Sequence, residues 1–246
     1  MDGIVIKIPI DQVINVFSVV VLLPLVFHLW RRTKESTTPS LSAFRWFFVF
    51  VLLMMMAFAL PFLVIKDLTL VQMSQNIAHF CFMVAITFLL RSITLLLGYN
   101  RRLFILYIPA LISFIGATLF FWQMSVLEPS IPVDILATKS FVLFDFLNTA
   151  PIASNFISGI IGLLVFLTGT ILFFVAYAQA SNQILRKRSL YLGLGHLVAV
   201  VAVGANFIAG QVSVVFPFFT LAALATLISI LLVYRGATLK VVRRES

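Results

Sequence analysis

Charged residues are the scarcest class in this chain. Only 10% of its 246 residues are Asp, Glu, Lys or Arg, whereas 62% are hydrophobic. A soluble domain usually carries about 25% charged residues, and a water-soluble fold of this composition would expose large apolar patches. The composition therefore excludes an ordinary soluble domain and predicts a chain that folds in a lipid bilayer.

Cysteine and catalytic motifs are also nearly absent. Cys81 is the single cysteine, so the chain has no CxxC motif and forms no intramolecular disulfide. It has no HExxH motif and no carboxylate pair within an apolar segment, which argues against metalloprotease and intramembrane aspartyl-protease activity. The last apolar segment holds no lysine that could carry retinal. We therefore predict a protein that is not an enzyme, with no catalytic residues and no metal site.

Seven apolar segments are long enough to cross a membrane, which takes about 20 residues in a helix. They comprise residues 12–30, 44–65, 69–97, 103–125, 152–179, 190–209 and 212–234. The sequence thus predicts an all-α fold, a polytopic membrane bundle of seven transmembrane helices in a single domain over residues 1–246.

Basic residues between these segments predict the orientation. All of the 17 Lys and Arg residues except Lys7, Lys66 and Lys139 fall on one side of the predicted bundle. Lys and Arg concentrate in cytoplasmic loops, so we expect a multi-pass protein of the cell membrane with its N-terminus outside and its C-terminus in the cytoplasm. The net charge of +9 does not indicate nucleic-acid binding, because the basic residues are spread over several loops. We expect these loops to contact anionic lipid headgroups.

Two connections differ in character. Residues 31–42, on the cytoplasmic side, are polar, and we expect a flexible linker there. Residues 124–151, on the outer side, contain several prolines and then an apolar run over 140–147 that Asp145 interrupts. This run fits either a short interfacial helix or a hairpin lid over the bundle, and a loop that only joins two helices is equally compatible.

Polar residues inside the membrane are costly and are therefore the candidates for function. Three of them, Gln72, Asn76 and His79, follow a spacing of four and three residues, which places them on one helix face. Asn155 and Asn206 lie at a similar depth in other helices. If these faces converge, the five residues line an outward-open pocket for a small ligand. The commoner role of such residues is interhelical hydrogen bonding that only holds a bundle together.

Two histidines, His79 and His196, fall within the membrane. A pair of histidines on facing helices is able to ligate haem. Helical rise places these two at depths that differ by about 6 Å, and no further haem motif accompanies them, so we predict no cofactor. Small residues such as Gly162 and Gly193 also indicate that the fifth and sixth apolar segments approach closely.

We hypothesise a receptor-like or sensory protein that binds a small ligand or a partner from the outer side. Its seven-helix topology resembles that of prokaryotic seven-helix sensor regions, and this resemblance implies a signal that passes through the basic loops to a membrane or cytoplasmic protein partner. The topology also resembles that of three-plus-one-plus-three transporters, which implies transport through the same cavity. A non-catalytic subunit of a larger membrane complex is the third hypothesis.

Overall fold

Six long helices dominate the computed structural model. The structure describes residues 10–35, 38–64, 68–96, 136–138, 141–143, 152–209 and 216–239, with side chains described over 13–34, 38–59, 74, 77–96, 159–205 and 220–239. The helices are α1 (Ile10–Glu35), α2 (Pro39–Val64), α3 (Leu68–Leu96), α5 (Ile152–Gln179), α6 (Gln183–Ala209) and α7 (Phe216–Thr238). All six are long and apolar enough to cross a membrane. By composition, the described chain is a membrane-spanning helical bundle.

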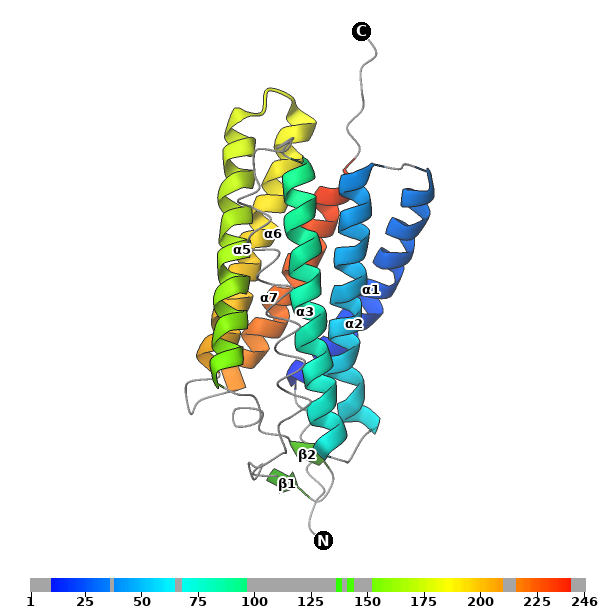
Figure 1. Cartoon of the computed structure of the whole chain (residues 1–246), viewed down its shortest axis with the longest axis vertical. Helices are drawn as coiled ribbons and strands as arrows, with labels where there is room; N and C mark the ends of the chain where they lie inside the picture. Colours follow the sequence, from blue (N-terminus) through cyan, green and yellow to red (C-terminus); the bar gives the residue numbers. More distant parts are fainter. Residues whose placement is uncertain are drawn as a thin grey trace.

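The helices run roughly side by side and alternate in direction, with one exception (Figure 1). Helices α3 and α5 both run away from the end of the bundle at which α1 begins. Leu96, the last residue of α3, and Ile152, the first residue of α5, therefore lie at opposite ends of the bundle. The predicted helix over 103–125 falls outside the described residues.

Several helices extend beyond the apolar segments from which they were predicted. Helix α1 continues to Glu35 and α2 starts at Pro39, so most of the predicted linker is helical. Proline is favoured in the first helical turn because its missing N–H has no partner there anyway. Helix α6 starts earlier than predicted, because the Asn182 side chain accepts a hydrogen bond of 2.8 Å from the Ile184 backbone N–H and caps the helix. This start places Arg186–Arg188 inside α6 instead of in a loop.

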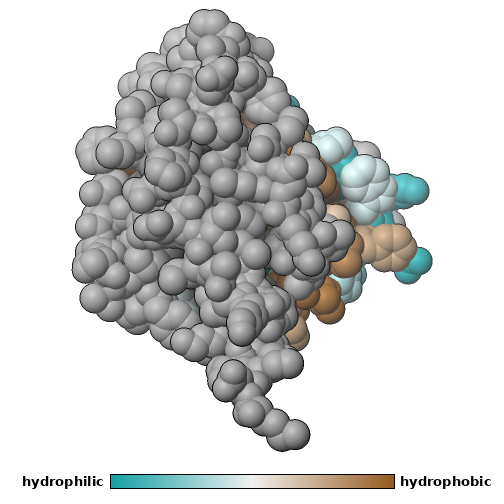
Figure 2. Space-filling model, turned by 90° about the horizontal axis from the view of Figure 1, so that it is seen from below, coloured by the Kyte–Doolittle hydropathy of each residue, from teal (hydrophilic) through white to brown (hydrophobic). Residues whose placement is uncertain are grey.

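The outward faces of the helices are apolar. On α1 the exposed hydrophobic side chains recur every three or four residues and form one stripe: Val13, Phe17, Val20, Leu23, Phe27 and Trp30. In the view from the end where α3 begins, hydrophobic side chains line the described flank on the α1 side, with hydrophilic side chains farther out (Figure 2). Such stripes suit a helix surrounded by lipid.

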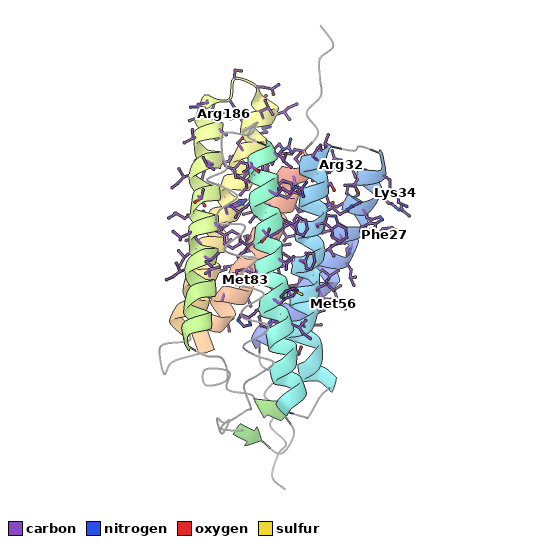
Figure 3. The ribbon with its side chains drawn as sticks, viewed as in Figure 1. Phe27, Arg32, Lys34, Met56, Met83 and Arg186 are labelled. Carbon is purple, nitrogen blue, oxygen red and sulfur yellow. The ribbon has the colours of Figure 1, made fainter. Side chains whose placement is uncertain are left out.

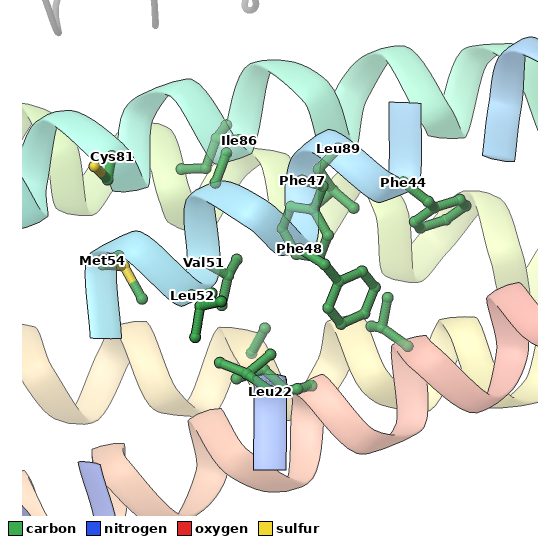
Figure 4. Close-up of a cluster of buried hydrophobic side chains, with 14 of the residues drawn as sticks. Leu22, Phe44, Phe47, Phe48, Val51, Leu52, Met54, Cys81, Ile86 and Leu89 are labelled. Carbon is green, nitrogen blue, oxygen red and sulfur yellow. The ribbon is translucent and has the colours of Figure 1, made fainter. Parts of the chain in front are cut away.

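Large side chains fill the space between α1, α2 and α3. Phe44 and Phe48 of α2 are fully buried, as are Leu22 of α1 and Ile86 and Leu89 of α3. In Figure 4 the side chains of Ile86 and Leu89 lie against α2, and Leu22 lies near Phe48. Because α2 contacts both neighbours, it forms the centre of this half of the bundle.

Glycines bring α5, α6 and α7 close together. A Cβ atom on Gly193 of α6 would lie 3.3 Å from the ring of Phe174 on α5, so the predicted close approach of these two helices is confirmed. A Cβ on Gly195 would lie 2.7 Å from Val233 of α7, and one on Gly236 of α7 would lie 2.6 Å from Leu192. Helix α6 is therefore packed tightly on two sides.

A short β-hairpin occupies part of the segment 124–151. Strands β1 (Leu136–Thr138) and β2 (Phe141–Leu143) pair antiparallel, with Ala137 opposite Val142. The hairpin lies near the end at which α3 begins (Figure 1). Of the two conformations considered for this segment, the described strands agree with the hairpin; a lid role remains a prediction.

Candidate functional site

The predicted ligand-binding residues lie in three different helices. Gln72, Asn76 and His79 belong to α3, Asn155 to α5 and Asn206 to α6. His79 is the member of this set whose side chain is described, and its ring lies edge-on against Phe58 of α2, with 5.9 Å between ring centroids. The side chains of the other four fall outside the described ones. The pocket that they were predicted to line stays a prediction.

Helices α3, α5 and α6 meet at Gly162 of α5. A Cβ atom there would lie 3.1 Å from the Phe82 ring of α3 and 3.7 Å from the Val203 side chain of α6. His79 precedes Phe82 by about one turn, and Asn206 follows Val203 by about one turn. Asn155 precedes Gly162 by about two turns. His79, Asn155 and Asn206 therefore all lie nearer than this apolar contact to the end of the bundle where α3 begins (Figure 1). The predicted pocket would lie on that side of the contact.

Most described hydroxyl groups in the core bond within their own helix. The Ser18 hydroxyl donates to the carbonyl of Ile14, and the Thr170 hydroxyl donates to that of Phe166, both at 2.8 Å. Each of these hydrogen bonds lies within one helix, so it does not hold two helices together. Ser74 of α3 behaves differently, because its hydroxyl donates to the Ala57 carbonyl of α2.

His196 of α6 is enclosed by α5. Its Nδ1 lies 2.7 Å from the Leu192 carbonyl oxygen, which only accepts, so Nδ1 carries the proton of this bond. The rings of Phe166 and Phe173 flank the imidazole, and Gly169 leaves the space that the ring occupies. Nε2 is buried with no hydrogen-bond partner. His79 packs on α2 and His196 on α5, so the two membrane histidines have different helix neighbours.

Arginines and aromatic rings gather at the opposite end of the bundle. The Arg45 guanidinium lies 4.4 Å from the Trp30 ring centroid and 5.3 Å from that of Trp46, and its Nη1 donates to the Thr33 hydroxyl at 3.1 Å. Figure 3 shows Arg32, Lys34 and Arg186 at this same end. A belt of aromatic side chains is typical of a membrane interface.

Two arginines at this end are buried in a way that the sequence did not predict. The Nε atoms of Arg45 and Arg188 are buried and have no hydrogen-bond partner. Arg188 lies before the predicted segment 190–209, whereas the structure places it inside α6; Arg45 lies inside α2, within the predicted segment 44–65. Pro39 and Asn182 were the signals that predict these helix starts, because proline and asparagine favour the first positions of helices.

The described residues contain no group of three His, Cys, Asp or Glu side chains that could hold a metal ion. Comparisons with known protein families, with curated protein sequences and with solved structures found no match to this chain. The geometry of the chain itself therefore carries the functional argument.

Proposed function

We propose that the chain is a seven-helix, receptor-like protein of the cell membrane that binds a small ligand or partner from the outer side, between α3, α5 and α6. Its N-terminus lies outside and its C-terminus in the cytoplasm. The contact of Phe82, Gly162 and Val203 is the observation that carries this proposal.

The parallel course of α3 and α5 supports a seventh crossing. Leu96 and Ile152 lie at opposite ends of the bundle (Figure 1), so the chain between them has to return through or along it. Residues 103–125 form an apolar segment of spanning length within that stretch. A crossing there makes every successive helix alternate in direction.

The distribution of charge supports the orientation. Basic side chains described by the structure lie at the end of the bundle where α1 ends and α6 begins: Arg31, Arg32, Lys34, Arg45, Arg91, Arg186, Lys187, Arg188 and Arg235. The cytoplasmic side of a membrane protein carries the excess of Lys and Arg. This end is then cytoplasmic, and the predicted pocket opens on the other side.

Contacts at the basic end support a receptor-like protein over a transporter. Arg32 Nη1 donates to the Thr238 carbonyl of α7, and Arg45 of α2 bonds Thr33 of α1. Alternating access would have to open this end in each cycle, whereas binding a ligand from the outer side does not require it. A partner in the membrane or the cytoplasm belongs to the same proposal, since the apolar outer stripes suit protein as well as lipid.

Cysteine labelling tests the orientation, because the chain contains only Cys81. In a Cys81→Ala background, Lys139→Cys should react with a membrane-impermeant maleimide in intact cells. Asn182→Cys, in the exposed turn between α5 and α6, should react only after permeabilisation. The reverse pattern would contradict the proposed orientation.

The pocket is tested with a small charged methanethiosulfonate reagent added from outside. Asn76→Cys should react, because a water-filled pocket lets the thiol ionise, and only the thiolate is reactive. Ile77→Cys is the matched control: this neighbouring side chain is 41% exposed on the outer surface of α3. Hydrocarbon there keeps the thiol protonated and unreactive.

The outcomes separate the hypotheses. An unreactive Asn76→Cys, or an equally reactive Ile77→Cys, contradicts the pocket. Reaction of Asn76→Cys from both sides of the membrane favours the transporter. Reaction from outside only, with Val203→Cys unreactive beneath it, supports the receptor-like protein.

A further inference from the structure

Positive charge at the basic end has no described acidic counterpart. The side chains that the structure describes include no Asp or Glu. Several arginines there lie on aromatic rings: Arg31 on Phe27 and Arg186 on Tyr177, with 4.4 Å and 4.7 Å to the ring centroids. Aromatic faces attract cations, but they neutralise no charge. This end of the protein is therefore suited to bind anions.

Arg188 of α6 is one of the half-buried cations at this end. It lies four residues, about one turn, before Leu192, and Leu192 packs against Gly236 near the end of α7. The same face of α6 therefore directs Arg188 toward the last turn of α7. Its Nε is buried there and has no hydrogen-bond partner. A buried donor without a partner is costly, so this position requires an acceptor.

Arg32 of α1 approaches the same place from the other side. Its Nη1 donates to the carbonyl of Thr238, at the end of α7. Its positive charge acts on Arg188, which it repels, and on the hydroxyl of Tyr234. The Tyr234 ring is held between His28 of α1 and Phe48 of α2, at 6.2 Å and 6.0 Å between centroids. The positive charges of Arg32 and Arg188 therefore meet near the end of α7, and Tyr234 lies on the α1 side of it.

Arg188 lies in the second turn of α6, whose start is capped by Asn182. The partial positive charge at a helix N-terminus falls off within the first turn, so it affects Arg188 little. The unpartnered Nε and the neighbouring charge of Arg32 are the two features that favour an anion there. An anion placed beside Arg188 would relieve the repulsion from Arg32 and satisfy the buried donor.

We propose that Arg32 and Arg188 bind one phosphate-bearing anion between α1, α6 and α7. Arginine guanidinium groups match the geometry of phosphate oxygens and donate to them in pairs. Arg32 lies two residues after Trp30 in α1, and tryptophan is enriched at the membrane–water interface, at the level of the lipid headgroups. The anion is either the headgroup of an anionic phospholipid or a free phosphate ion. This site is independent of the pocket proposed at the outer end.

Thermal unfolding of the purified full chain in a nonionic detergent tests the site. One arm adds sodium phosphate against sodium chloride at equal ionic strength. The other adds short-chain phosphatidylglycerol against short-chain phosphatidylcholine. We expect phosphate, phosphatidylglycerol or both to raise Tm of the unmodified protein. An effect of phosphate alone identifies the free ion, and an effect confined to phosphatidylglycerol identifies the lipid headgroup; no effect of either overturns the proposal.

Matched variants distinguish a specific anion site at Arg188 from a general attraction of anions to the basic end. Arg188→Gln should raise the apparent Kd for the effective anion about tenfold or more, which corresponds to a lost interaction of about 1.4 kcal/mol. Arg186→Gln removes the same charge from the exposed side of α6 and should leave the Kd nearly unchanged. Equal weakening by both variants would show diffuse electrostatics and overturn the site.

A purely structural role of Arg188 gives a different signature. Without added anion, Arg188→Gln should be at least as stable as the unmodified chain, because the repulsion from Arg32 is gone. A structural arginine would lower Tm with and without the anion, which would contradict the proposal. If Arg188→Gln does not fold, Arg188→Lys serves instead. It keeps the charge but loses paired donation, so it should bind more weakly than arginine, and unchanged binding would overturn the proposed geometry.

Discussion

The two described halves of the bundle differ in their use of glycine. Helices α1, α2 and α3 meet through large buried side chains such as Phe44, Phe48 and Leu89, and the sequence contains no glycine between Gly3 and Gly98. Helices α5, α6 and α7 also bury large side chains such as Phe173, but glycines and alanines lie at their closest contacts. The residues that mark this second half are Gly169, Gly193, Gly195, Gly236, Ala199, Ala202, Ala222, Ala223 and Ala225.

This difference shows two ways to hold helices together in lipid. Lipid tails are as apolar as leucine, so helix association depends on packing contacts more than on exclusion of water. In the first half, large side chains supply these contacts by interlocking. In the second half, backbones supply them by approaching closely where side chains are absent. The first half should therefore be sensitive to lost volume, and the second to added volume.

The largest effect is expected from Phe48→Ala in α2. Phe48 is fully buried and its ring packs edge-on against Phe47 and Tyr234. Removing it should lower the free energy of unfolding by about 3 kcal/mol, the lower end of the range for buried Phe→Ala. The lower end applies because the unfolded chain stays in lipid or detergent. The ring is therefore not transferred from water on folding, and the cavity left by its removal accounts for most of the lost stability. Denaturation of the purified protein in mixed micelles by sodium dodecyl sulfate measures it.

Phe17→Ala in α1 is the control for this prediction. Phe17 is 54% exposed on the apolar stripe of α1, so its removal leaves no enclosed cavity and should change stability little. If both variants lose the same stability, packing volume does not explain the first half of the bundle.

The helices themselves could be predicted from the sequence, but their ends at the basic side could not. Apolar length identifies the part of a helix that crosses hydrocarbon. Helix ends outside that part depend on local capping, as at Asn182 and Pro39, and apolar length does not report it. For that reason Arg188 was assigned to a loop, although it lies inside α6.

Contacts between helices were predicted only in outline. Gly193 was expected to mark the close approach of the sixth apolar segment to the fifth. Gly195 lies two residues further on and so points about 200° away from Gly193 on the helix. Gly193 accordingly contacts α5 and Gly195 contacts α7. In the candidate pocket, spacing placed Gln72, Asn76 and His79 on one face. Only the fold could show that His79 packs on α2, because a helix face does not specify its neighbour.

An intermediate effect is expected from Gly169→Ala in α5. The added Cβ would overlap the His196 ring, whose Nε2 would lie 2.9 Å away, and the ring is confined between Phe166 and Phe173. Such overpacking should lower the free energy of unfolding by about 2 kcal/mol. Gly204→Ala in α6 is the matched control, because a Cβ there meets nothing within 4 Å. Its helix should lose no stability.

A double variant shows whether the His196 ring is the cause. In a His196→Ala background the obstructing ring is gone, so Gly169→Ala should cost little further stability. The coupling free energy between the two positions should reach about 1 kcal/mol or more. If the stability losses of the two single variants simply add, the His196 ring is not the cause of the Gly169→Ala effect. Added side-chain volume would then not explain the sensitivity of this contact.

The smallest effect is expected from Ser74→Ala, which removes the hydrogen bond from α3 to the Ala57 carbonyl of α2. Interhelical hydrogen bonds in membranes contribute about 0.6 kcal/mol on average, so the same denaturation assay should show a loss of that size. Ser18→Ala is the control: its hydroxyl donates to Ile14 in its own helix, where the carbonyl keeps its backbone partner, and stability should hardly change. A Ser74→Ala loss as large as that of Phe48→Ala would mean that α2 and α3 associate mainly through a polar contact. A small loss leaves side-chain volume as the main source of stability in the first half.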